Sequence, residues 1–142
     1  MRHSEVKFLN HKPEDLFNLV SDIKKYPEFL PWCLGSRVKT INQNNLRADL
    51  IVGFKIYREV FKSNVILNKN KFEINVEYLD GPFENLNNFW SFKKKNNGCE
   101  ISFLVDFTFN KRILNSVLET FFSEAVKKMV NAFEKRANYL YK

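Results

Sequence analysis

The sequence of 142 residues is poor in the residue types that carry metal and nucleophile chemistry. It has 2 cysteines and 2 histidines, without a Cys-x-x-Cys pair or a cysteine–histidine set at metal-ligand spacing. It also lacks a glycine-rich phosphate loop, a Gly-x-Ser-x-Gly nucleophile elbow and a His-Glu-x-x-His motif. We therefore expect no metal and no catalytic cofactor, and we interpret Cys33 and Cys99 as reduced, packed thiols in a cytosolic compartment.

Long apolar runs are missing as well. No stretch approaches the ~18 residues of a membrane-spanning helix, and no signal peptide or transit sequence is recognisable. We expect a soluble cytoplasmic protein, with peripheral contact at the inner face of the cytoplasmic membrane left open. No alternating basic–aromatic pattern predicts base stacking, so sequence-specific nucleic-acid binding is not expected.

The balance of charge is basic. The net charge of +7 favours weak attraction to RNA, ribosomes or anionic membranes. An AT-rich genome would enrich lysine and asparagine and produce the same charge. The run Lys93-Lys94-Lys95 is interpreted as a solvated strand end that could also touch phosphates.

Phenylalanine is the residue that the chain has in abundance, with 15 Phe against 2 Trp and 5 Tyr. Phenylalanine buries a large area without needing a polar partner, so this composition predicts a thick core or an apolar cavity. No linker, repeat or low-complexity segment divides residues 1–142. We expect a single domain, since a chain of this length buries roughly two thirds of its unfolded surface.

The apolar periodicity predicts an α+β fold. Positions 46–56 alternate as one strand, and most other positions between 35 and 109 also follow a period of two. The predicted elements are, in order, a short strand near residues 3–8, a helix from 13 to about 25, a corner over 26–33, antiparallel strands from 35 to 109 and a helix from about 111 to 141. A curved antiparallel sheet of six to seven strands would wrap around this long C-terminal helix.

The C-terminal helix has an unusually wide apolar face. Its apolar residues, which include Ile113 and Leu114, cover well over half of the circumference, whereas packing on one sheet needs about 100°. The excess must contact the first helix, the corner, a ligand or a membrane. Arg136 projects near the centre of this face, where an unpaired charge is costly. It either snorkels or pairs with a carboxylate, or it contacts a ligand head group.

The corner over residues 26–33 is stiff and apolar at once. Pro27 and Pro31 fix φ and remove two backbone donors, which excludes a long helix or a central strand. Its large apolar side chains are expected to leave water; they are Tyr26, Phe29, Leu30 and Trp32. Such a segment fits either a plug of the core or the mouth of a binding cavity.

Few side chains are candidates for catalysis. His3 and His11 lie near the N-terminus and have no apparent nucleophile to serve. Glu59 lies in the middle of a strand and could act as a general acid or base inside a cavity, but such a residue is more often solvated or ion-paired. We assign no catalytic residue.

Five sets of segments in a fixed order carry a family signal across almost the whole chain. They are 19–22 leading into 26–33, 52–54, 80–83 followed by Leu86, Trp90 and Phe92, 106–107, and 129–137. In these segments the chain resembles the coenzyme Q-binding protein family. That family lies within the START-like polyketide cyclase/dehydrase superfamily, and its bacterial members include ribosome-association toxins. Lys12 departs from the pattern, because a small capping residue is expected before Pro13.

The resemblance implies a helix-grip fold with an apolar tunnel between the sheet and the long helix. It also implies a non-enzymatic function, namely the binding and delivery of ubiquinone or a related polyprenyl lipid in support of respiratory electron transport. The expected tunnel lining is Phe54, Trp90, Phe92, Phe107, Leu118, Phe121, Phe122 and Val126. Pro31 and Trp32 would form the rim, and Arg136 is the candidate contact for the head group.

Two other functions stay open. One is a regulator that binds the large ribosomal subunit and blocks subunit association, which the net charge and the family resemblance motivate. The other, which we rank third, is a cyclase or hydrolase that uses the cavity, for which Glu59 and Arg136 are the available side chains.

Overall fold

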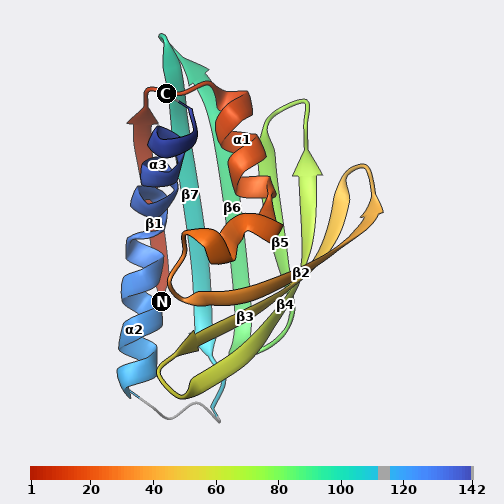
Figure 1. Ribbon diagram of the computed structural model, residues 1–142, viewed down its shortest axis with the longest axis vertical. Coiled ribbons are helices and arrows are strands. Elements are labelled where there is room, and N and C mark those ends of the chain that lie inside the picture. The colour runs from red at the N-terminus through yellow and green to blue at the C-terminus, as the bar shows by residue number, and fades with distance from the viewer. Residues whose placement is uncertain (112–115, 142) are drawn as a thin grey trace.

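The computed structural model describes residues 1–111 and 116–141, which form one curved sheet and the helices on its concave face (Figure 1). The seven strands are antiparallel and lie in the order β1-β7-β6-β5-β4-β3-β2. This α+β helix-grip arrangement confirms the predicted fold class. The elements are β1 (Arg2–Leu9), α1 (Pro13–Ser21), the 3-10 helix η1 (Ile23–Glu28), β2 (Cys33–Asn42), β3 (Asn45–Phe54), β4 (Tyr57–Asn68), β5 (Glu73–Asp80), β6 (Phe83–Lys95), β7 (Gly98–Phe109), α2 (Ser116–Lys127) and α3 (Met129–Leu140).

The alternating pattern places one face of each central strand in the core. Trp90 on β6 lies opposite Ile74 on β5 and Phe103 on β7, and all three are buried on the same face. The strand predicted over 46–56 ends earlier, at Phe54. Lys55 has a φ of 57°, and the chain turns there into β4, so Ile56 is 88% exposed at the hairpin tip. The left-handed backbone at Lys55 makes this tight reversal possible.

The edge strand β1 shows its apolar side chains to solvent. Val6 and Phe8 are 66% and 47% exposed, whereas His3, Glu5 and Lys7 lie on the inner face opposite β7 residues of the core. The polar inner face of β1 contacts the last helix, α3. β1 therefore packs through polar contacts where the central strands pack through apolar ones.

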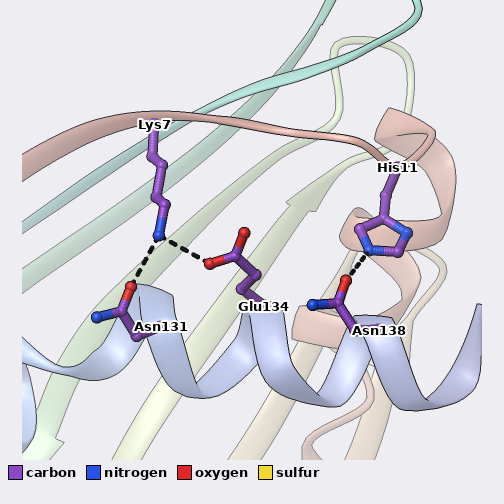
Figure 2. A network of polar contacts seen from close by, with 5 residues as sticks. All are labelled: Lys7, His11, Asn131, Glu134 and Asn138. Carbon is purple, nitrogen blue, oxygen red and sulfur yellow. Dashed lines mark hydrogen bonds and ion pairs between the residues drawn. The ribbon is translucent and has the colours of Figure 1, made fainter.

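Figure 2 shows these contacts between the N-terminal segment and α3. Lys7 Nζ donates to Asn131 Oδ1 at 2.9 Å and to Glu134 Oε1 at 2.7 Å. One turn further along α3, His11 Nε2 lies 2.7 Å from Asn138 Oδ1. The three contacts link α3 to the N-terminal segment at the edge of the sheet.

The single long C-terminal helix of the prediction is two helices in the structure. Lys128 separates α2 from α3, with φ −98° and ψ 4°, outside the usual helical region. Its N–H lies 3.2 Å from both Glu124 O and Ala125 O. The predicted start near 111 cannot be compared, because Ile113 and Leu114 lie outside the described residues. None of the helices in the described part of the chain is long and apolar enough to span a membrane.

Candidate functional site: an apolar cavity inside the grip

A cavity of about 140 Å³ lies between the inner face of the sheet and the helices. Side chains from α1, η1, the five strands β3 to β7, α2 and α3 border it. The side chains of the wall differ in size from one strand to another. The strands β3 and β4 contribute small side chains, Ala48 and Ser63, which face each other in register, whereas β6 and β7 contribute Trp90 and Phe107. Protein interiors are normally close-packed, so the small residues leave this volume unfilled.

Three polar side chains border the otherwise apolar cavity. The Tyr26 hydroxyl donates to the carbonyl of Val20, so this phenol is already satisfied by its own segment. Burial raises the pKa of Tyr26 above its ordinary value, with the nearby Cys33 and Asp22 contributing. Tyr26 is the one titratable side chain on the described part of the wall. It is held as a neutral phenol at physiological pH.

The other two polar side chains, Ser63 and Asn88, come from strands on either side of β5. Asn88 lies opposite Val76, and its amide bridges to β7. Ser63 is 2% exposed. Sequence reasoning did not single out either residue. The alternation Phe61-Ser63-Val65-Leu67 was the signal for Ser63, because a period of two places it on the buried face.

The corner over 26–33 contributes to the wall from one end. Residues 26–28 of the corner form the end of the 3-10 helix η1, and Leu30 is 1% exposed in the core. Trp32 borders the cavity, and its carbonyl accepts from Gly53 N–H at 3.0 Å, which ties the corner to the end of β3. Pro31, the other predicted rim residue, is exposed and lies off the described wall. The corner thus supplies both a core plug and one side of the cavity.

The predicted tunnel residues fall into two groups. Trp90, Phe107, Phe122 and Val126 border the cavity. The others are not part of the described wall and are Phe54, Phe92, Leu118 and Phe121. Their role in binding a ligand stays a prediction.

Phe54 and Phe121 stack on each other where the β3–β4 hairpin meets α2. Phe92 packs edge-to-face on Phe17, and Leu118 is 3% exposed in the core. These four side chains belong to the core or pack against it.

Arg136 already has partners away from the cavity. Its Nη2 lies 2.9 Å from Glu28 Oε1, and its guanidinium sits 5.2 Å from the ring centre of Phe29 and 5.1 Å from that of Tyr139. Of the alternatives predicted for Arg136, the structure therefore contains the pairing with a carboxylate. Glu59 is half-buried on β4 and lies off the described wall.

No group of three or more histidine, cysteine or acidic side chains within the described residues could hold a metal ion. Cys33 and Cys99 are buried and unpaired. Burial raises the pKa of both thiols to about 11, although a hydrogen bond to backbone opposes the shift at each. Both sulfurs are thus protonated and unreactive at neutral pH. The chemistry that the site offers is an apolar enclosure with a few hydrogen-bonding groups.

A curved sheet that grips C-terminal helices around such an interior cavity defines a helix-grip protein. The family model described as polyketide cyclase / dehydrase and lipid transport matches residues 9–134. The chain belongs to this family, which confirms the superfamily that the sequence motifs resemble.

Individual relatives differ in what their names say they do. The ribosome association toxin RatA of Rickettsia prowazekii is 37% identical over 139 residues, covering 96% of this chain and 95% of that protein. The mitochondrial coenzyme Q-binding protein COQ10 homolog B of Xenopus laevis is 32% identical over 146 residues, covering 99% of this chain and 59% of that protein. The crystal structure of the Zhui aromatase/cyclase from Streptomyces sp. R1128 covers 100% of this chain and 96% of its own at a TM-score of 0.85. That enzyme is 12% identical, so its likeness concerns the fold alone.

Proposed function

We propose that this protein binds ubiquinone or a related polyprenyl lipid in its cavity and delivers it for respiratory electron transport, without a chemical step. The observation that carries the proposal is the unfilled apolar cavity. By the usual cost of about 24 cal/mol per Å³, a void of 140 Å³ lowers the stability of the fold by about 3 kcal/mol. A ligand that fills the void recovers part of this free energy on binding.

The volume also limits how the ligand is held. An engineered cavity of about 150 Å³ in another protein binds a single benzene ring, so this cavity matches one quinone-sized ring rather than a whole polyprenyl lipid. The tail must then lie beyond the cavity or displace part of its wall. The COQ10 relative is named for coenzyme Q binding, which supports a quinone as the ring.

A binding role without catalysis agrees with the side chains at the wall. Acid–base catalysis needs a group whose pKa lies near the working pH, and burial moves the Tyr26 phenol away from that range. Ser63 and Asn88 can hold a polar atom but do not titrate.

Intrinsic fluorescence tests the proposal directly, because both tryptophans of the chain, Trp32 and Trp90, border the cavity. Titration with decylubiquinone is expected to quench their emission saturably with a stoichiometry of one. Extraction of protein purified from its own host is expected to yield an unmodified quinone or prenyl lipid by mass spectrometry. The proposal is wrong if neither the titration nor the extract gives a bound lipid.

A second candidate function is ribosome binding that blocks subunit association. It is supported by the net charge of +7 and by the name of the RatA relative. Lys93, Lys94 and Lys95 are exposed together at the end of β6, where they could contact rRNA phosphates.

Co-sedimentation with large ribosomal subunits over a salt series tests this second function. The variant K93E/K94E is expected to lose binding, while K39E/K62E, which changes the same number of exposed charges elsewhere on the sheet, retains more of it. Absence of co-sedimentation at low salt would remove the ribosome hypothesis and leave the lipid hypothesis intact.

A further inference from the structure

Two hydrogen-bond donors point to a polar recognition site inside the apolar cavity. We infer that Ser63 and Asn88 recognise an acceptor oxygen of the ligand, such as a ring carbonyl of a quinone, and that they select such a ligand over a hydrocarbon of the same shape. This inference rests on the proposed lipid-binding function and adds the residues that determine its specificity.

The Ser63 hydroxyl is the stronger of the two observations. Ser63 is 2% exposed and borders the cavity, and its hydroxyl has no hydrogen-bond partner among residues 1–111 and 116–141. A serine hydroxyl can donate one hydrogen bond and accept others. Its neighbours across the sheet, Ala48 and Tyr78, do not satisfy it: Ala48 has no polar side-chain atom, and the Tyr78 hydroxyl contacts the backbone of Phe83. A ligand oxygen in the cavity would supply the missing partner.

The orientation of the Asn88 amide is fixed by its partners. Trp90 Nε1 can only donate, so the atom 3.2 Å from it must be Asn88 Oδ1. The Leu104 carbonyl can only accept, so the atom 2.9 Å from it must be Asn88 Nδ2. One N–H of Nδ2 therefore remains for a further acceptor.

The two groups lie on the same face of the sheet, on β4 and β6, with β5 between them. Strands are spaced by about 4.8 Å, so the two backbones are about 10 Å apart and the side chains converge on one cavity. Both can donate a hydrogen bond, and Arg136 is engaged with Glu28 outside the described wall. The cavity thus favours a ligand with carbonyl oxygens over a pure hydrocarbon.

The test compares decylubiquinone with decylbenzene, which has the same tail but no ring oxygens. The apparent Kd of each is obtained from the dependence of Tm on ligand concentration by differential scanning calorimetry. The wild-type protein is expected to bind the quinone at least tenfold more tightly. S63A is expected to weaken quinone binding about tenfold and to leave decylbenzene binding unchanged.

Two control variants separate recognition from packing. V65A removes methyl groups from the same strand and wall, and is expected to weaken both ligands equally. S63T keeps the hydroxyl and should retain the preference for the quinone.

The outcomes distinguish the two levels of the proposal. If the wild-type protein binds both ligands and S63A leaves their affinity ratio unchanged, the polar recognition is wrong and the lipid-binding function stands. If S63A does not fold, equal affinity of the wild-type protein for the two ligands still overturns the inference. If neither ligand binds, the proposed function fails together with it.

Discussion

The rings of Phe54 and Phe121 stack almost parallel, with centroids 4.2 Å apart and an angle of 16° between their planes. Phe54 ends β3 immediately before the hairpin turn, and Phe121 lies in α2. The pair therefore joins the tip of the β3–β4 hairpin to the helix across the end of the grip. Because Phe122 and Val126 of the same helix border the cavity, this contact connects one wall of the cavity to the β3–β4 hairpin.

A double-mutant cycle at this pair measures the strength of the closure. F54A and F121A are each expected to destabilise the protein, and the double variant to lose about 1 kcal/mol less than the sum, since the stacking is removed only once. Urea unfolding gives the free energies, and the tilted Phe17–Phe72 pair in the core serves as a comparison. Strictly additive effects at Phe54 and Phe121 would mean that the two rings do not stabilise each other.

Filling the cavity is expected to raise the free energy of unfolding and to weaken ligand binding. Ala48 is 1% exposed on the cavity wall, and A48L would occupy part of the void. We expect a gain of about 1 kcal/mol in the free energy of unfolding together with at least a tenfold loss in quinone affinity. Ala137, 0% exposed in α3 and away from the described wall, is the matched control. A137L should overpack the core and destabilise it by about 1–3 kcal/mol. Equal destabilisation by both variants would show that the cavity has no spare room.

Removal of the Lys7 amine tests the attachment of α3 to the edge strand. K7M keeps the aliphatic stem and deletes the contacts to Asn131 and Glu134. The Lys7 and Glu134 side chains are 35% and 30% exposed, so we expect a loss of only about 0.5–1 kcal/mol, reduced further by salt. K95M breaks the more exposed pair with Glu100 on the β6–β7 hairpin and should cost less. Thermal unfolding by circular dichroism at low and high salt measures both. An insensitive K7M would mean that apolar packing alone positions α3.

The two thiols predict a fall in stability at alkaline pH. Burial raises the pKa of Cys33 and Cys99 to about 11 in the folded protein, above the value in the unfolded chain. As pH rises, the unfolded state loses its thiol protons before the folded state does. The free energy of unfolding therefore begins to fall above the unfolded pKa and continues to fall up to about pH 11. Urea unfolding from pH 8 to 11 should show this slope, and C33A/C99A should flatten it. An equal slope in that variant would assign the effect to other groups, such as Tyr26.

The sheet was predictable from sequence because its signal is local. Alternating side chains specify which face of a central strand is buried, and turn residues such as Asn96, with a φ of 52°, specify where hairpins end. The same reasoning failed at Ile56. Its apolar side chain continued the alternation, but the register Phe54↔Tyr57 leaves room only for a turn between them.

The cavity was predictable in kind but not in detail. A surplus of phenylalanine and an over-wide helix face indicate apolar volume, yet they do not say which side chains fill it and which border it. That distinction depends on register across several strands, as when Ala48 and Ser63 come opposite each other. The ion pair of Arg136 with Glu28, 108 residues away, likewise depends on the tertiary fold.

The break at Lys128 divides the C-terminal helical segment into two helices that are buried to different extents. Val130, Phe133 and Ala137 of α3 are each at most 1% exposed, and polar contacts anchor that helix, whereas α2 has Leu118 and Phe122 as its buried residues. Because the backbone leaves helical dihedrals at Lys128, we expect the two helices to open as separate units of local unfolding. Amide hydrogens of α2 should then exchange with solvent faster than those of α3. For the proposed ligand, such a partial opening would provide a route to the cavity that the rest of the fold does not share.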